Sequence, residues 1–221
     1  MDPGSKSRLM PIAVERFDPK TLFGQIARTL AEAECLPQKE LFEAWEVAKR
    51  TQRRLRGRGV RRVVDLACGH GVAGAVLALI EPRIAEVVGV DRRLPPCAKK
   101  SLAAMTARFP QLGGRVSLIE GELRAVEVRA DDLVVCVHGC GALTDVAIDR
   151  AIAGRAMVAV LPCCHKKRDA DTGGLEGWCD FALAIDVRRA ERLRAAGFRV
   201  VTQKIPEEIT PKNRLLIGVP K

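Results

Sequence analysis

The segment Val63–Gly71, with the sequence VVDLACGHG, constrains the fold more than any other part of the chain. Two β-branched residues lead into an acid, small residues then form a turn, and the apolar run of residues 72–80 follows. This order predicts a buried strand, a tight turn and a helix. In such a unit, backbone N–H groups and the helix N-terminus face a ligand. The small side chains of Ala67, Gly69 and Gly71 would let that ligand approach the backbone closely.

Length, composition and charge limit the function classes that remain. A chain of 221 residues suits one domain and is long enough to bury a full core. No apolar run approaches the ~20 residues that span a bilayer, and residues 1–16 carry no apolar signal-peptide segment, so we expect a cytoplasmic protein. The eight cysteines lack the spacing of a small disulfide scaffold. The net charge of +10 favours a nucleic-acid partner, although an Arg-rich composition with many Ala, Gly and Val residues is also typical of a GC-rich genome.

Hydrophobic periodicity predicts strands that alternate with helices. Residues 1–20 form an irregular arm, and two amphipathic helices follow it at 21–34 and 38–55. The further strands are expected at residues 86–91, 115–120, 132–138, 155–161, 198–204 and 213–219, and the further helices at 95–109, 143–153 and 178–196. Such alternation implies an α/β fold with a mostly parallel sheet covered on both faces. The last two strands have no helix between them, so they should pair antiparallel at one edge.

The turn and the expected strands carry a family resemblance. The pattern D-x-A-x-G-x-G that begins at Asp65 is a one-substitution variant of the first motif of S-adenosylmethionine (SAM) methyltransferases. Seven strands with an antiparallel ending resemble the Rossmann-like class I fold of these enzymes. The resemblance implies SAM as the cofactor and divides the chain into an N-terminal arm with helices, residues 1–58, and a methyltransferase domain, residues 59–221.

The same resemblance implies a set of cofactor-binding residues. Asp91, at the tip of the second strand, would accept hydrogen bonds from both ribose hydroxyls, although this placement would serve NAD equally well. Glu122 stands where such enzymes keep an acid near the adenine amino group. The implied residues are Asp65, Ala67, Cys68, Gly69, Gly71, Asp91, Arg92, Glu122 and His138.

Two later segments resemble a narrower family. VHGCGALTD at 137–145 and LPCCHK at 161–166 are similar to the H-x-C-G-x-x-T-D and P-C-C-x-K signatures of the family that contains methyltransferase-like 25 and the ribosomal RNA adenine dimethylase domain protein. The tRNA 2′-O-methyltransferases are similar more distantly. The chain departs from the pattern at Ala67, which replaces a glycine, and at His70, where Lys is common. It also lacks the zinc-finger extension of the tRNA enzymes. The resemblance implies an RNA substrate.

The Cys and His residues of these two segments should lie at the ends of the fourth and fifth strands. Three interpretations follow for His138, Cys140, Cys163, Cys164 and His165. A histidine could act as general base, one thiolate could attack a pyrimidine ring, or the group could bind zinc. The C-x-x-C spacing typical of zinc sites is absent, so we assign no metal ligand. The alternative is that small cysteines, Cys68 among them, only pack around SAM.

One residue and two basic segments have further candidate roles. Asp145 is either catalytic or the cap of the helix after the fourth strand. The basic stretch Lys49–Arg62 is either a surface for a phosphate backbone or a solvated helix end. Residues 166–168 could hold an anionic substrate. We therefore expect a SAM-dependent methyltransferase acting on RNA, either tRNA or rRNA. A small-molecule methyltransferase and a catalytically silent SAM-binding partner protein are the alternatives.

Overall fold

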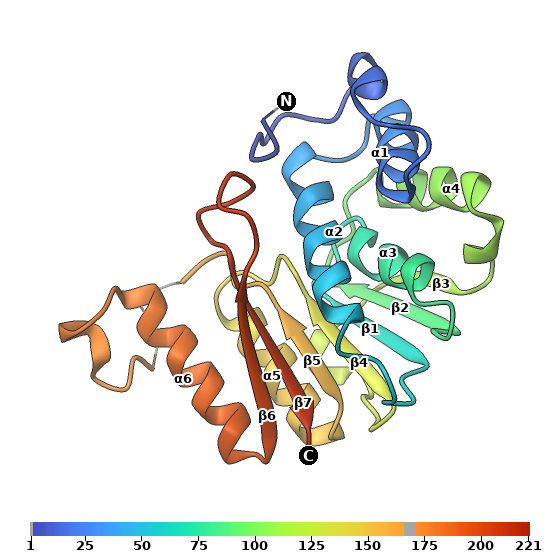
Figure 1. Cartoon of the computed structure of the whole chain (residues 1–221). Coiled ribbons are helices and arrows are strands. Elements are labelled where there is room, and N and C mark those ends of the chain that lie inside the picture. The colour runs from blue at the N-terminus through green and yellow to red at the C-terminus, as the bar shows by residue number, and fades with distance from the viewer. Residues whose placement is uncertain (1, 166–170) are drawn as a thin grey trace.

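The computed structural model describes residues 2–165 and 171–221 and contains a seven-stranded sheet in the order β3-β2-β1-β4-β5-β7-β6 (Figure 1). Strand β7 runs antiparallel to both β5 and β6, and the other neighbouring pairs are parallel. The expected mostly parallel sheet with an antiparallel ending is therefore confirmed. The strands are β1 (Arg62–Leu66), β2 (Glu86–Asp91), β3 (Val116–Glu120), β4 (Asp132–Cys136), β5 (Met157–Val160), β6 (Phe198–Lys204) and β7 (Arg214–Pro220).

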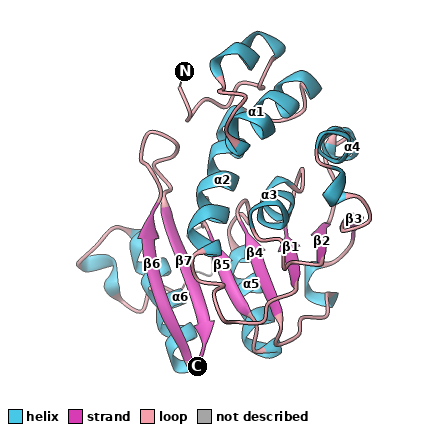
Figure 2. Cartoon of the chain, turned by 45° about the vertical axis from the view of Figure 1, so that its right-hand side comes forward, coloured by secondary structure: helices cyan, strands magenta, loops and turns pink. Residues whose placement is uncertain are grey.

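Helices cover both faces of the sheet (Figure 2). They are α1 (Leu22–Ala33), α2 (Gln38–Gln52), α3 (Val72–Ile80), α4 (Ala98–Arg108), α5 (Ala142–Gly154) and α6 (Phe181–Ala195). Short 3₁₀ turns lie at η1 (Pro11–Arg16), η2 (Pro110–Leu112), η3 (Leu123–Ala125) and η4 (Leu175–Gly177). Strand β4 ends two residues before the predicted end at His138, which instead lies in the loop that follows. Helix α6 begins later than predicted because the Asp180 side chain caps it by accepting a hydrogen bond from the Leu183 N–H.

Successive residues of each strand point to opposite faces of the sheet and so contribute to two hydrophobic cores. Val63 packs with α1–α4 on one face, whereas its neighbour Val64 packs with α5 and α6 on the other. The N-terminal helices belong to the first core, and the rings of Phe23 and Trp45 lie 5.2 Å apart within it. Trp45 is thus a packing residue. Within the described residues, no helix is both long and apolar enough to cross a membrane.

The basic stretch Lys49–Arg62 leads from the end of α2 into the first residue of β1. Several of its cations are already paired. Lys49 and Arg50 contact Glu46 at 2.7 and 2.8 Å. Arg62 forms a two-bond ion pair with buried Asp132. Residues 53–61 lead into the amino end of β1, whereas the Val63–Gly71 motif continues past the last residue of that strand, so these two segments lie at opposite ends of β1 (Figure 1). Arg50, by contrast, donates to the Lys204 carbonyl at the carboxyl end of β6.

Candidate cofactor and acceptor site

The turn between β1 and α3 uses three left-handed backbone positions. The φ angles are +56° at Ala67, +54° at Gly69 and +72° at Gly71. L-amino acids with a side chain rarely adopt this region, which explains why the motif consists of small residues. A Cβ atom built at Gly69 would meet no protein atom within 4 Å. The turn therefore presents open backbone to a ligand at that position.

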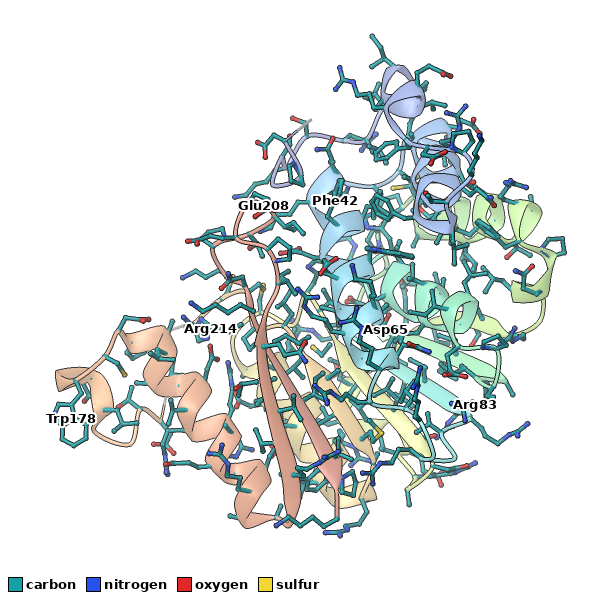
Figure 3. The ribbon with its side chains drawn as sticks, in the orientation of Figure 1. Phe42, Asp65, Arg83, Trp178, Glu208 and Arg214 are labelled. Atoms are coloured by element: carbon teal, nitrogen blue, oxygen red, sulfur yellow. The ribbon has the colours of Figure 1, made fainter. Side chains whose placement is uncertain are left out.

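Asp65 holds this turn from inside the protein. Its side chain is buried in the middle of the molecule (Figure 3), and Oδ2 accepts a hydrogen bond of 3.0 Å from the N–H of Gly74 in α3. Burial raises the pKa of Asp65 to about 7. Helix α3 lies so close to the sheet here that a Cβ at Gly74 would come within 2.6 Å of Val87. Asp65 thus ties the strand to the helix and also lines the pocket described below.

Asp91 ends β2 and faces the same turn. Its Oδ2 accepts a hydrogen bond from Gly69 N at 3.1 Å, and its Oδ1 accepts one from Arg93 N at 3.3 Å. Each carboxylate oxygen has a second lone pair for a ligand hydroxyl. Arg92 follows Asp91 and Glu122 follows β3, and both are exposed at this edge of the sheet.

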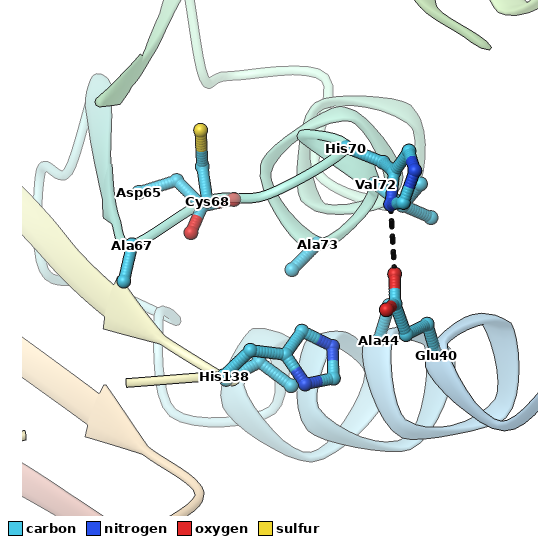
Figure 4. Close-up of a pocket in the computed structure, with 10 residues that line it drawn as sticks. Glu40, Ala44, Asp65, Ala67, Cys68, His70, Val72, Ala73 and His138 are labelled. Carbon is cyan, nitrogen blue, oxygen red and sulfur yellow. Dashed lines mark hydrogen bonds and ion pairs between the residues drawn. The ribbon is translucent and has the colours of Figure 1, made fainter. Parts of the chain in front are cut away.

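A small pocket, with room for about one water molecule, lies between this turn, α2 and the end of β4 (Figure 4). Ala67, Cys68 and His138 line it, together with Glu40 from α2. The His138 side chain is 30% exposed, and its Nδ1 is 3.7 Å from Oε2 of buried Glu43. That distance is too long for a hydrogen bond but short enough for electrostatic attraction to an imidazolium. Burial raises the pKa of Glu43 despite the neighbouring His138 and Lys39.

His70 is fixed between two partners. Its Nδ1 lies 2.9 Å from Oε2 of Glu40, and its Nε2 lies 3.5 Å from Sγ of Cys97. Burial opposes ionisation of Glu40, yet the hydrogen bond from His70 and nearby charges lower the pKa of this carboxyl below its usual value. Glu40 and Glu43 were not among the predicted site residues. Their position one turn apart, on the buried side of an amphipathic helix, is the signal that could have identified them.

The predicted convergence of cysteines is present in part. Sγ of Cys140 lies 3.3 Å from Sγ of Cys163 and 3.5 Å from Sγ of Cys164. Burial and the adjacent thiols raise the pKa of Cys163. His165 points elsewhere: its side chain is 3% exposed and its Nε2 is 2.8 Å from Oδ1 of Asp186 in α6.

Asp145 lies in the first turn of α5 and contacts α6. Its carboxylate accepts hydrogen bonds from Arg189 at 2.7 and 3.1 Å and from Arg192 at 2.9 Å. The helix N-cap is Gly141, and no side chain caps this end, so the capping interpretation of Asp145 is wrong. The anion-binding prediction for residues 166–168 lies outside the described residues.

Comparison of the sequence with known protein families identifies the family of this chain. Residues 39–170, more than half of the chain, match the model of a family described as "Methyltransferase domain". A curated relative, the glutathione S-transferase C-terminal domain-containing protein of Bos taurus, is 24% identical over 196 residues. The match covers 72% of this chain and 30% of the relative, so the chain spans less than a third of that protein.

Solved structures share the fold. Magnesium protoporphyrin IX methyltransferase from Synechocystis PCC 6803, with bound SAM, has a TM-score of 0.54 at 16% identity over 95% of this chain and 96% of its own. Mitomycin 7-O-methyltransferase has a TM-score of 0.51 at 16% identity over 96% of this chain and 61% of its own. These likenesses support the class I methyltransferase fold. They do not extend to the narrower family of methyltransferase-like 25 and the ribosomal RNA adenine dimethylase domain protein.

Proposed function

This chain belongs to the methyltransferase domain family, and we propose that it binds SAM over the β1–α3 turn and transfers the methyl group to an acceptor beside His138. One observation carries the proposal: Ala67, Cys68 and His138 line the same pocket although they follow different strands. In open α/β sheets, ligands bind outside the carboxyl ends of the strands, near the point where the strand order reverses. Strands β1 and β4 flank that point in this sheet.

The residues at the turn fit SAM. The open backbone at Gly69 leaves room for a ligand to approach, and the Asp91 carboxylate retains acceptor capacity for ribose hydroxyls. Arg92 and Glu122 border the same edge, and we assign them to the adenosine side. The buried Asp65 side chain supports the turn by accepting a hydrogen bond from Gly74 of α3. When bound, SAM supplies a methyl group on a positively charged sulfur, which is already a good leaving group.

His138 is the proposed general base. An imidazole titrates near neutral pH and can accept the proton of an acceptor hydroxyl or ring nitrogen. The nearby carboxylate of Glu43 would stabilise the imidazolium that forms. Cys140, Cys163 and Cys164 lie together and are not among the residues that line the pocket beside His138, which disfavours the pyrimidine-attack interpretation. We assign positioning roles to Asp145 and His165, since both contact α6.

We propose a small-molecule acceptor. The basic stretch Lys49–Arg62, which favoured RNA, runs from the last turn of α2 to the first residue of β1, whereas the pocket lies beyond the last residue of that strand. Lys49, Arg50 and Arg62 are also paired with carboxylates of the protein itself. RNA is the second candidate, because the net charge of +10 still favours contact with a polyanion.

Transfer of label from radiolabelled SAM would test the function. The full chain is incubated with fractionated cellular RNA and, separately, with small-molecule extract. Label in the small-molecule fraction supports the proposal. Label confined to RNA establishes the second candidate, and no label in either fraction overturns the assigned transfer.

Two variants separate cofactor binding from transfer. Asp91→Asn should weaken SAM binding by about tenfold or more in calorimetry, because a charge-assisted acceptor is removed. His138→Ala should keep SAM binding and slow transfer by about 10²- to 10⁴-fold. Asp131→Asn, an exposed change before β4, is the matched control and should alter neither. Equal behaviour of the Asp91 variant and this control would contradict the assigned cofactor site.

A further inference from the structure

Three cysteines from two separate loops meet beyond the ends of β4 and β5. Cys140 follows β4, whereas Cys163 and Cys164 follow β5. The three sulfur atoms all lie within 4.8 Å of one another, and the Cys140–Cys163 separation is 3.3 Å across 23 positions of the chain. The fold, rather than local sequence spacing, therefore brings the three thiols together.

The separations of the sulfur atoms are those of a zinc-thiolate site. Zinc binds thiolate sulfur at about 2.3 Å in tetrahedral geometry, which sets neighbouring ligand sulfurs about 3.8 Å apart. The Cys140 sulfur lies 3.3 and 3.5 Å from the other two, so small side-chain rotations complete the geometry. Thiolates are soft ligands that select zinc and copper(I) over magnesium and calcium.

Backbone and side-chain hydrogen bonds hold the two loops in register. The N–H of Gly141 donates to the carbonyl of Cys164 at 3.0 Å. The N–H of Leu161 donates to the carbonyl of Cys136 at 3.0 Å, and the Thr144 hydroxyl donates to the Gly139 carbonyl at 2.7 Å. These bonds order the loops without a metal ion, which reduces the cost of assembling the ligands.

We propose that Cys140, Cys163 and Cys164 form a three-thiolate site for a thiophilic metal ion, with zinc as its occupant. Cys140 and Cys164 are exposed, so a fourth coordination position faces outward. Among the described residues, these three cysteines form a group of potential ligands that lie close enough together to hold one metal ion. Three protein ligands with an accessible fourth position are typical of zinc that binds a water or substrate atom, whereas structural sites have four protein ligands.

Metal content of the purified full chain tests the proposal. The protein is reduced, loaded with zinc chloride, desalted and analysed by plasma mass spectrometry. We expect one zinc ion per chain in the native protein. The triple variant C140S/C163S/C164S should retain none, because serine hydroxyls are poor zinc ligands. Cobalt(II) in place of zinc should give a thiolate-to-metal charge-transfer band that weakens with each Cys→Ser change.

A matched control and a folding check keep the test decisive. Cys179→Ser removes a thiol outside the cluster, whose Sγ lies 3.5 Å from the Leu175 carbonyl, and should leave zinc binding unchanged. Circular dichroism of the triple variant should match that of the native protein, since each substitution is nearly isosteric. Zinc retained by the triple variant, or absent from the loaded native protein, would overturn the site. Because zinc is measured without SAM, the result is independent of the proposed methyl transfer.

Discussion

Ala67 stands in a backbone conformation that favours glycine. Its φ is +56°, and its side chain is only 6% exposed. A left-handed conformation costs an L-residue roughly 1–2 kcal/mol, and a β-branched side chain suffers more. Ala67→Val should therefore lower the free energy of unfolding by about 2–3 kcal/mol, measured by urea denaturation.

Ala67→Gly is the matched control. Relief of the left-handed strain, about 1 kcal/mol, is offset by the loss of a buried methyl group and by the greater freedom of glycine in the unfolded chain. We expect a change in unfolding free energy of less than about 1 kcal/mol and unchanged SAM affinity. Equal destabilisation of the Val and Gly variants would contradict the assigned backbone strain.

Asp65 should make stability depend on pH. Its folded pKa of about 7 lies above the ordinary value of 3.8, so the folded protein retains a proton that the unfolded chain has released between these two values. Stability contributed by the protonated form is present below about pH 4 and falls as pH rises to about 7. Asp65→Asn cannot ionise and can still accept the Gly74 hydrogen bond, so its stability should fall less over this window.

Thermal unfolding of both proteins from pH 4 to 8 measures this effect. The difference in unfolding free energy between variant and native protein isolates Asp65 from other titrating groups, Glu43 among them. The difference should shift in favour of Asp65→Asn as pH rises and then level off above about pH 7. A difference that stays constant across the range would contradict the assigned pKa.

At the scale of elements, one arginine joins helices α5 and α6. Arg189 is 2% exposed and binds Asp145 at 2.7 Å and Asp186 at 3.1 Å, and it also donates to the Gly141 carbonyl. Removal of one partner from a buried ion pair leaves uncompensated charge. Asp145 keeps Arg192 and Asp186 keeps Arg214 as cationic partners, so Arg189→Met should lower the free energy of unfolding in urea by about 3 kcal/mol, the lower end of the range for a broken buried pair.

Arg188, the preceding residue of the same helix, provides the control. Its ion pairs with Asp171 and Glu191 face solvent, so Arg188→Met should leave the denaturation midpoint essentially unchanged. If the two methionine variants unfold at the same urea concentration, the buried network does not join the helices as described.

Elements with strong local signals were predicted closely, whereas contacts between distant segments were not. The bounds of α3 and β2 agree with the sequence prediction because apolar runs and flanking turns define them locally. The pairing of Glu43 with His138 joins a helix of the N-terminal region to the loop after β4, and no sequence spacing encodes it. The sequence predicted that the cysteines and His165 converge. The structure brings Cys140, Cys163 and Cys164 together but directs His165 to Asp186 in α6.

At the scale of the whole molecule, the exposed arginines between α2 and β1 lie at the end of the sheet opposite the candidate site. The exposed residues Arg53, Arg56 and Arg58 precede β1, and the exposed pair Arg92 and Arg93 follows β2. Parallel strands have their amino ends at one edge and their carboxyl ends at the other, so these two groups lie at opposite ends of the sheet. Any polyanion held by the first group therefore contacts a surface remote from the pocket.

Charge reversal at the two groups should consequently have different effects. R53E/R56E/R58E should weaken binding to bulk tRNA and reduce the slope of log K against log salt by roughly 0.7–0.9 for each phosphate that the variant no longer neutralises. Methyl transfer to a small acceptor should be unchanged in this variant, because the pocket is at the other end of β1. R92E/R93E should instead impair SAM binding, since it places two carboxylates beside Asp91. A loss of methyl transfer in R53E/R56E/R58E with SAM affinity intact would mean that the acceptor reaches the basic stretch, and would establish a polyanionic acceptor such as RNA.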